Sequence, residues 1–288
     1  MATTDIDGIE TYYEIRGTGA PLLLCAPGGF DADTRKWDSQ GIYAKLRFLD
    51  NLPQDFQCIA FDRRDTGRSG GRVEALTWGD YARHAKGMLD HLGLESAHVM
   101  GGCMGCTVAT AFGVAYPAAT RSMVLFWPVG GAKYRINGHL RFAQHLAYVQ
   151  QNGLQAVVDL AREPGKAFGK DPRVGPWVSV LQTDDRFAVD YAGLDVEAYK
   201  LVIAQMARTL LDRDSAPGAE PEQLLRLNVP SLIIPGADES HATSAARYLE
   251  ECLPGSSFWD TPVGAQTPNT TVPKVVDFLH QAETDWRG

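Results

Sequence analysis

The segment Gly101-Gly102-Cys103-Met104-Gly105 has the residue types of a nucleophilic turn. It lies between a short apolar run, residues 97–100, and a helix-like segment, residues 107–112. A sharp strand-to-helix turn strains the backbone of its central residue, so small residues have to flank that residue on both sides. The start of a helix also favours the thiolate form of a cysteine through its backbone N–H groups and its dipole. The pattern therefore predicts that Cys103 is a catalytic nucleophile.

Two other interpretations of this segment stay open. Cys103 is a structural thiol if the segment is only a glycine-rich turn in the core. Cys103 and Cys106 also form a CxxC pair, which at a helix start is typical of dithiol redox sites. The flanking Gly101 and Gly105 favour the nucleophilic turn, with Cys106 as a small residue packed behind it.

The rest of the chain must position this turn. Along it, short apolar runs alternate with segments that have a helical pattern. This alternation predicts an α/β fold with a doubly wound, mostly parallel sheet that has helices on both faces. Residues 9–15 alternate in polarity and are expected to form an opening hairpin with the next run. The apolar runs cover residues 21–25, 58–61, 97–100, 123–126 and 231–234.

The alternation stops after Trp127-Pro128. Residues 130–219 are helical in pattern and contain no convincing buried strand. We interpret this segment as an inserted helical cap, so that residues 1–129 and 220–288 form the core domain.

Local signals mark several helix ends. Thr77 and Asp80 are typical of a capping box, and Gly93 is placed where the same helix should end. In the last helix, Pro273 is expected in the first turn.

Four segments resemble the α/β-hydrolase superfamily, and they follow one another along the chain in the order that the superfamily has. Besides the turn at Cys103, residues 62–69 (DRRDTGRS) are similar to a loop of the family, with Asp65 where the family has glycine. Residues 229–236 resemble the strand before the family's acid, and residues 275–279 its closing helix. The resemblance implies a nucleophile elbow at Cys103, and cysteine nucleophiles occur in the superfamily among dienelactone hydrolases and polyhydroxyalkanoate synthases.

The resemblance also implies an oxyanion hole. Residues 24–30 lie where the family carries a His-Gly loop that supplies one donor, although the histidine is absent here. The implied donors are the backbone N–H of Met104 and that of Gly28 or Gly29.

The histidine of the family's triad is missing from its usual place. The loop after the last strand has Gln266 near the expected position. His241 is the candidate in its stead, because it follows a strand end in the segment Asp238-Glu239-Ser240-His241. The family's spacing selects Glu239 as the acid, whereas Asp238, three residues before His241, could orient the imidazole. A purely structural role for His241, with Asp238 or Glu239 as a helix cap, also stays open.

The remaining histidines are weaker candidates. His84 and His91 are expected on the polar face of their helix, and His98 inside a strand. His139 and His145 belong to the cap, where they could line a pocket. His280 is expected on the surface.

Composition limits the partners. The net charge is −8 and the pI about 5.4, which opposes a nucleic-acid surface. The chain has no signal-peptide pattern and no run of 18 apolar residues, so we expect a cytoplasmic protein without a membrane partner. Five scattered cysteines suit free thiols in a reducing compartment. No metal or cofactor is expected, and the sequence leaves a monomer and a homo-oligomer open.

The leading hypothesis is a hydrolase that acts on a small-molecule carbonyl substrate through a Cys103 thioester. The bond cleaved would belong to an ester, a lactone or an amide, or be a C–C bond next to a carbonyl. Trp127 and Trp177 are expected to contact the substrate. The alternatives are a non-hydrolytic enzyme on the same fold (a lyase, decarboxylase, isomerase or acyltransferase) and a binding protein with a broken triad.

Overall fold

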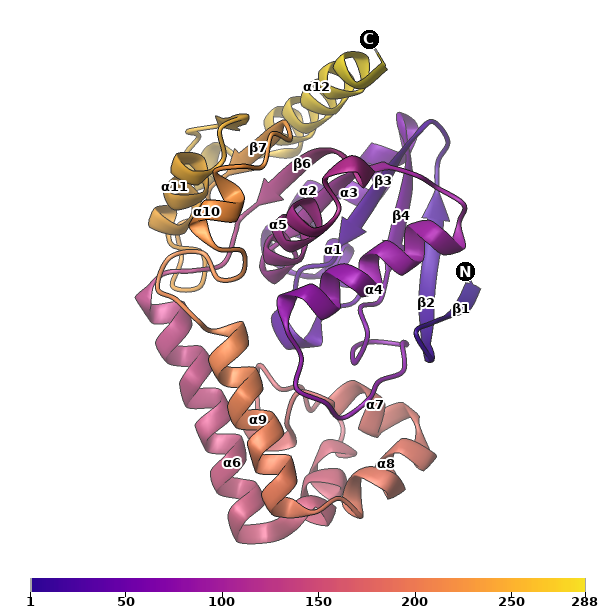
Figure 1. The fold of residues 1–288 in the computed structure, drawn as a ribbon, viewed down its shortest axis with the longest axis vertical. Coiled ribbons are helices and arrows are strands. Elements are labelled where there is room, and N and C mark those ends of the chain that lie inside the picture. Colours follow the sequence, from indigo (N-terminus) through magenta and orange to yellow (C-terminus); the bar gives the residue numbers. More distant parts are fainter. Residues whose placement is uncertain (1, 288) are drawn as a thin grey trace.

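The computed structural model describes residues 2–287, and its centre is one eight-stranded sheet (Figure 1). The strand order is β1-β2-β4-β3-β5-β6-β7-β8. Neighbouring strands from β4 to β8 run parallel, while β1 and β2 run antiparallel to each other and β2 is antiparallel to β4. The expected α/β class and mostly parallel sheet are therefore confirmed. The strands are β1 (Ala2–Ile6), β2 (Ile9–Arg16), β3 (Ala20–Cys25), β4 (Phe56–Phe61), β5 (Ala97–Gly102), β6 (Thr120–Phe126), β7 (Ser231–Ile234) and β8 (Ser256–Phe258).

The opening hairpin differs from the sequence prediction. Strand β2 pairs with β1 and with β4, whereas β3 pairs with β4 and β5. The predicted pairing of residues 9–15 with residues 21–25 is therefore wrong. The physical reason is burial: β3 is apolar and buried along nearly its whole length, so it is most stable between two parallel neighbours in the middle of the sheet.

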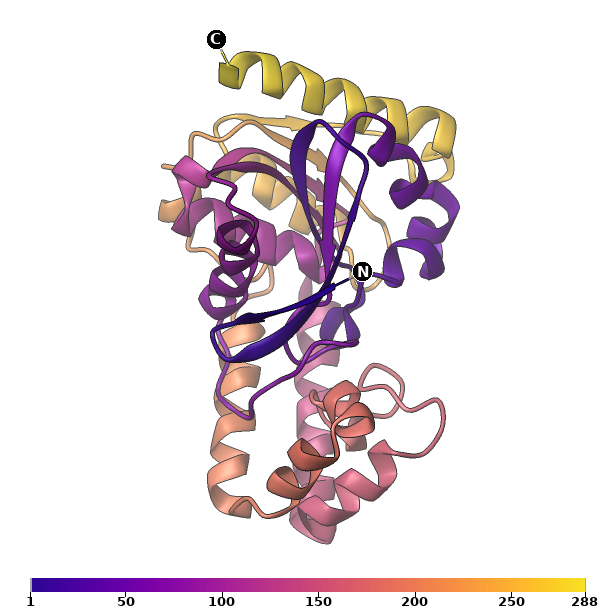
Figure 2. The same ribbon diagram turned by 90° about the vertical axis from the view of Figure 1, so that its right-hand side faces the viewer.

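Helices cover both faces of the sheet (Figure 2). One face carries α4, α5, α10 and α11, and the other carries α1, α2, α3 and α12. The helices are α1 (Lys36–Ser39), α2 (Gly41–Leu46), α3 (Phe48–Asn51), α4 (Trp78–His91), α5 (Met104–Ala115), α6 (Ala132–Ala161), α7 (Val178–Thr183), α8 (Asp185–Ala192), α9 (Val196–Leu210), α10 (Pro221–Leu224), α11 (Thr243–Cys252) and α12 (Pro268–Arg287), with short 3-10 helices at Gly29–Asp31, Leu52–Gln54, Pro117–Ala119, Pro172–Val174 and Val263–Ala265.

Two helix ends test the local signals. Thr77 and Asp80 form the predicted capping box at the start of α4, and Gly93 follows the end of α4 with a φ of 65°. Helix α12 begins at Pro268, so Pro273 lies inside the helix. The predicted position of Pro273 in the first turn is therefore wrong. The helix starts before Pro273 because its first turn also packs against the protein: Thr271 in that turn is buried.

The helices α6 to α9 stand apart from the two helical layers, beyond the carboxyl ends of the parallel strands (Figures 1 and 2). Helix α6 is broken at Gly153, where φ is 76°. Asp31 connects this group to the core, because its carboxylate accepts the backbone N–H groups of Phe168 (3.1 Å) and Gly169 (3.0 Å). We call α6 to α9 the cap helices; the domain boundaries at residues 130 and 219 stay a prediction.

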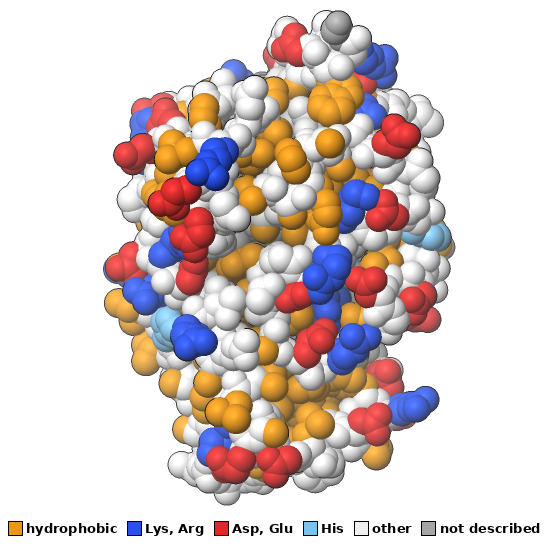
Figure 3. All heavy atoms as spheres, viewed as in Figure 1, with side chains coloured by type: hydrophobic (Ala, Val, Ile, Leu, Met, Phe, Trp, Pro, Cys, Tyr) orange, Lys and Arg blue, Asp and Glu red, His pale blue; other side chains and the backbone are white. Residues whose placement is uncertain are grey.

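No helix within residues 2–287 combines the length and the apolar character that a membrane crossing requires. On the face of the molecule drawn in Figure 3, cationic and anionic side chains are interspersed.

Candidate active site

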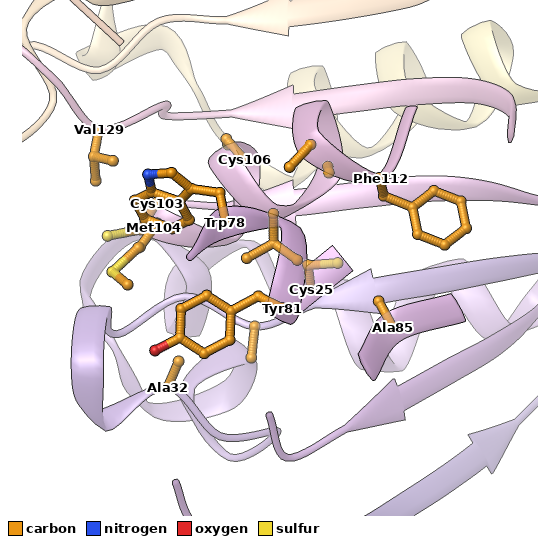
Figure 4. Packing of buried hydrophobic residues seen from close by; sticks show 14 of the residues in the cluster. Cys25, Ala32, Trp78, Tyr81, Ala85, Cys103, Met104, Cys106, Phe112 and Val129 are labelled. Carbon is orange, nitrogen blue, oxygen red and sulfur yellow. The ribbon is translucent and has the colours of Figure 1, made fainter. Parts of the chain in front are cut away.

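Cys103 lies at the sharp turn between β5 and α5. Its φ of 54° and ψ of −124° are strained values for a residue with a side chain, and it forms the N-cap of α5. In Figure 4, Cys103 and Met104 lie at one end of this helix, near Val129, and Phe112 lies toward its other end. The expected elbow geometry at Cys103 is thus present in the structure.

The glycines around Cys103 are required by close approaches. A Cβ atom on Gly101 would lie 2.3 Å from the Gly105 carbonyl oxygen. A Cβ on Gly105 would lie 2.1 Å from the carbonyl oxygen of Cys25, and one on Gly102 would lie 2.7 Å from the ring of Tyr43. The elbow therefore fits against β3 and α2 only without these side chains.

His241 and Asp238 form a tight pair in the loop after β7. The Nδ1 atom of His241 lies 2.8 Å and 2.9 Å from the two carboxylate oxygens of Asp238. Asp238 Oδ1 also accepts the backbone N–H groups of Ser240 and His241. The loop is held from the other side by Gly130, whose N–H donates to the Ser240 carbonyl at 3.1 Å. The imidazole is therefore fixed in orientation, with Nδ1 toward the acid.

The opposite nitrogen of His241 faces the thiol. Nε2 is buried and forms no hydrogen bond within residues 2–287, but His241 and Cys103 line the same cavity, and each shifts the pKa of the other. Cys103, His241 and Asp238 thus lie next to one another in the structure, with His241 between the thiol and the carboxylate.

Glu239, the acid selected by the family's spacing, is placed differently. Its side chain is exposed and pairs with Lys133 at 2.8 Å. The spacing of the loop brings Asp238, and not Glu239, to the imidazole.

The pair of His241 and Cys103 shifts two pKa values in opposite directions. Burial raises the pKa of the Cys103 thiol, but the neighbouring His241 charge and the backbone N–H groups of Gly28 and Met104 outweigh it, so this pKa lies below its ordinary value. Burial lowers the pKa of His241, yet Cys103 and Asp238 together raise it to about 9. These opposite shifts favour the ion pair of a thiolate and an imidazolium over the neutral pair.

The same two N–H groups define a place for an oxyanion. Met104 is the first residue of α5, so its N–H is free of an intrahelical partner, and Gly28 approaches from the loop after β3. Gly29, the alternative donor, also lines this space, and its carbonyl accepts a hydrogen bond from Arg63 at 2.9 Å. The backbone groups that lower the pKa of Cys103 are those of Gly28 and Met104. Gly28 and Met104 are thus the donors that converge on Cys103.

Gln266 stands near the usual place of the family's histidine and has a structural role. It is fully buried, and its Nε2 donates to the carbonyls of Pro235 (2.9 Å) and Thr261 (3.1 Å). Its Oε1 accepts the indole N–H of Trp127 at 2.7 Å. Trp127, in the left-handed region with φ 55°, packs its ring 5.4 Å from that of His241.

The two tryptophans expected at the substrate lie elsewhere. Trp127 does not line the cavity next to Cys103 within the described chain; it packs behind His241 instead. Trp177 is buried and donates to Asp65 and to the carbonyl of Arg72, both at 3.1 Å. Both indoles hold loops in place, because a buried indole N–H needs a partner.

The other histidines do not reach Cys103. His84 is buried against Thr11, which corrects the prediction that it is on a polar face, and His98 pairs with Ser122 and Glu283. His145 is buried in the cap helices beside Tyr199, and His139 contacts the Leu211 carbonyl. His280 is half-exposed beside Asp55, as expected.

Cys106 points away from the nucleophile. Its thiol donates to the carbonyls of Gly101 (3.1 Å) and Phe126 (3.3 Å), and burial raises its pKa well above the ordinary value. All five cysteines are free thiols. No cluster of three His, Cys, Asp or Glu side chains suited to a metal ion occurs within residues 2–287.

A cavity of about 190 Å³ opens onto Cys103 and His241 between the core and the cap helices. This volume is below the roughly 300–1,000 Å³ of sites for drug-sized ligands, so it suits a small molecule. Much of the wall is apolar. The cavity is lined by Gly28, Gly29, Phe30, Asp31, Gln40, Cys103, Met104, Val129, Tyr134, Gly138, Arg141, Phe168, Gly169, Leu211, Ser240 and His241.

Several of these residues were not predicted from the sequence. Tyr134, Gly138 and Arg141 are spaced by four and three residues, which places them on one face of α6. This spacing was visible in the sequence, but nothing there showed which face of the helix turns toward the nucleophile.

The architecture and the site geometry define an α/β-hydrolase fold with a sharp strand-to-helix turn at Cys103. A family model described as the alpha/beta hydrolase fold matches residues 21–162. The enol-lactonase from Burkholderia xenovorans LB400 has a similar structure, with a TM-score of 0.61 and 19% identity over 97% of this chain and all of that one.

Curated relatives point the same way. The chain is 26% identical to a putative carbamate hydrolase, RutD, of Azorhizobium caulinodans over 92% of this chain and 91% of the relative. It is 34% identical to 2-hydroxy-6-oxo-6-phenylhexa-2,4-dienoate hydrolase of Comamonas testosteroni over 29% of this chain and 26% of the relative. Together with the structural neighbour, these matches support the α/β-hydrolase fold for this chain.

Proposed function

We propose that this chain is a small-molecule hydrolase whose nucleophile is the Cys103 thiolate. His241 activates the thiol, and Asp238 orients the imidazole of His241. The observation that carries the proposal is the position of His241: one ring nitrogen is held by Asp238 and the other faces the elbow sulfur. A thiol tolerates this departure from the family's usual order, because it ionises more readily than a hydroxyl.

In the first half-reaction, the Cys103 sulfur attacks the substrate carbonyl carbon. The resulting oxyanion accepts hydrogen bonds from the N–H groups of Gly28 and Met104. The intermediate then collapses to a thioester, the bond to the leaving group breaks, and the Nε2–H of His241 gives its proton to that group.

In the second half-reaction, the now neutral His241 takes a proton from a water molecule. The hydroxide oxygen attacks the thioester carbonyl, and the C–S bond breaks to release the acid and restore the thiolate. Asp238 remains ionised throughout and stabilises the imidazolium at both ends of the cycle.

The proposed substrate is a small compound with an ester, a lactone or an amide, or with a cleavable C–C bond beside a carbonyl. The cavity volume supports a small substrate. The relatives named for carbamate and dienoate hydrolysis, and the structural neighbour named as an enol-lactonase, support cleavage next to a carbonyl carbon.

The test is a panel of small esters, lactones, carbamates and β-diketones, assayed in water enriched in ¹⁸O. We expect the product acid to carry the label, and mass spectrometry of the quenched reaction to show an acyl group on Cys103. A Cys103→Ala protein should lose turnover, whereas the control Cys252→Ala, which alters a thiol outside the site, should keep it. Full activity of Cys103→Ala would contradict the proposal, and an unlabelled product would indicate a non-hydrolytic reaction.

A further inference from the structure

We propose that Arg141 and Tyr134 form a carboxylate-binding subsite, so that the substrate is a carbonyl compound that also carries a carboxylate. This inference rests on the proposed function and names its substrate class. It starts from the two side chains that α6 turns into the cavity beside Cys103.

Arg141 is the only Lys or Arg among the described residues that line this cavity. Its guanidinium forms no ion pair and no hydrogen bond with any other side chain or backbone group of residues 2–287. Nearby cap arginines are engaged: Arg135 pairs with Asp214 at 2.9 Å, and Arg162 pairs with Asp185 at 2.6 Å. A guanidinium with five N–H donors is thus available to a ligand.

The one carboxylate in the cavity wall does not neutralise it. Asp31 uses its two oxygens for the backbone N–H groups of Phe168 and Gly169, and it is not within ion-pair distance of Arg141. Asp31 therefore fastens the cap to the core.

Tyr134 adds a second donor. Burial raises the pKa of its hydroxyl well above the ordinary value, and the Cys103 charge acts in the same direction, while the Arg141 charge opposes it. The phenol therefore stays protonated and lies within electrostatic reach of both groups. It has no hydrogen-bond partner within residues 2–287.

Shape supports the same ligand. Gly138, between these residues on α6, lets Leu211 pack against the helix backbone, because a Cβ there would lie 2.6 Å from Leu211. The rest of the wall includes Phe30, Val129 and Phe168, which suit a short carbon skeleton. A planar anion with two acceptor oxygens matches a guanidinium and a phenol, and the cavity volume of about 190 Å³ suits a small ligand.

The experiment compares the alkylation of Cys103 by two reagents of similar size: iodoacetate, which carries a carboxylate, and iodoacetamide, which carries an uncharged amide in its place. The rates are measured by peptide mass spectrometry on the wild type, Arg141→Gln, Arg141→Lys and the control Arg162→Gln, which removes a cation from the end of the same helix. The His241 charge also attracts iodoacetate, but it is common to all four proteins.

We expect the iodoacetate-to-iodoacetamide rate ratio to fall roughly five- to tenfold in Arg141→Gln, to recover in part in Arg141→Lys, and to stay unchanged in Arg162→Gln. An unchanged ratio in Arg141→Gln, with Cys103 still alkylated rapidly, would overturn the subsite and leave the proposed function standing. A Cys103 that reacts no faster than a thiol of the unfolded chain would overturn both.

A second readout uses only the wild-type protein, in case Arg141→Gln fails to fold. Butanoate should slow the iodoacetamide reaction of Cys103 at concentrations where butanamide does not. Equal protection by the acid and the amide would overturn the subsite.

Discussion

In the proposed mechanism, three residues set the reactivity of the site, and each acts through its neighbour. Asp238 holds His241, His241 holds the charge of Cys103, and the N–H groups of Gly28 and Met104 stabilise that charge further. A serine at position 103 would need His241 to remove a proton in every cycle. A cysteine ionises more readily than a serine, and the lowered pKa of Cys103 beside His241 makes the site suited to a thiol.

Asp238→Asn tests the first link in this series. The variant keeps the acceptor oxygen but loses the charge that raises the pKa of His241, so the thiolate fraction at pH 6.5 should fall. We expect iodoacetamide to alkylate Cys103 about tenfold more slowly, since one pKa unit corresponds to about 1.4 kcal/mol. The control is Glu239→Gln, which removes an equal charge from the exposed pair with Lys133 and should leave the rate unchanged. The reverse order of effects would assign the acid role to Glu239.

The sequence predicted part of this residue set. The glycine spacing located Cys103, and the absence of a histidine near Gln266 directed attention to His241. The choice between Asp238 and Glu239 depends on how one loop turns, which spacing alone does not determine. Arg141 and Tyr134 were missed because the inward face of a cap helix depends on its packing against the core.

At the scale of elements, the elbow is where β5, α5 and β3 approach most closely. Gly105 lies in the first turn of α5 against the carbonyl of Cys25, at the end of β3. The backbone of a central strand cannot move away without breaking its ladder with β4 and β5. Contact at this point therefore fixes the position of the nucleophile.

Gly105→Ala should displace this junction. The added Cβ would stand 2.1 Å from the Cys25 carbonyl oxygen, and we expect a loss of about 3 kcal/mol or more in the free energy of unfolding. Urea unfolding measures the change. Gly79→Ala is the control: it lies in the exposed first turn of α4, where the added Cβ meets Thr77 Oγ1 at 3.5 Å, and it should be neutral or stabilising. Equal stability of the two variants would show that the elbow can relax.

Gln266 links the loops after β6, β7 and β8. Gln266→Leu would leave the indole N–H of Trp127 and the carbonyls of Pro235 and Thr261 without their partner, at about 1–3 kcal/mol for each buried group that water cannot reach. We expect lower stability and, because Trp127 packs on His241, a lower kcat with a smaller change in KM. Gln266→Glu keeps the acceptor for Trp127 and should restore part of kcat; a kcat that stays at the wild-type value in Gln266→Leu would remove Trp127 from the positioning of His241.

Element prediction succeeded where burial is one-sided or complete. The central parallel strands are continuous apolar runs, and the α4 cap has an unambiguous local signal. Strand β1 was missed because Thr3, Thr4 and Asp5 carry the polarity of a loop, and it is stabilised by pairing at the edge of the sheet. The hairpin error has the same origin, since a pattern of polarity does not say which strand is the neighbour.

At the scale of the whole molecule, the cap helices lie beyond the carboxyl ends of the parallel strands (Figure 2), and α6 contributes Tyr134, Gly138 and Arg141 to the cavity beside Cys103. The break in the alternation of strands and helices is the basis for predicting a cap over residues 130–219, and this domain assignment stays a prediction. The enclosed cavity could not be predicted, since it depends on where Asp31 fastens the loop at Phe168 and Gly169.

The molecule also contains three histidines whose charge is suppressed by burial. Burial lowers the pKa of His84 to about 3, with the charges of Arg64 and Arg63 adding to the effect. Burial likewise lowers the pKa of His98 to about 4 against the opposing charge of Glu283, and that of His145 to about 4. They lie in α4, β5 and α6, so both the core and the cap are involved.

These shifts predict acid sensitivity. Each histidine stays neutral in the folded state, whereas in the unfolded state it takes up a proton below its ordinary pKa of 6.5. Between about pH 6.5 and pH 4 the unfolded state therefore binds more protons than the folded state. The free energy of unfolding should fall as the pH decreases through this range. The three together should reduce the free energy of unfolding by roughly 5 kcal/mol between pH 7 and pH 5. Urea unfolding at the two pH values measures this loss. His84→Gln keeps a partner for Thr11 and cannot titrate, so it should remove about a third of the pH dependence, and His145→Gln should remove a similar share. A pH dependence that His84→Gln leaves at the wild-type value would mean that His84 is protonated in the folded state, with its charge stabilised by a rearrangement around Thr11.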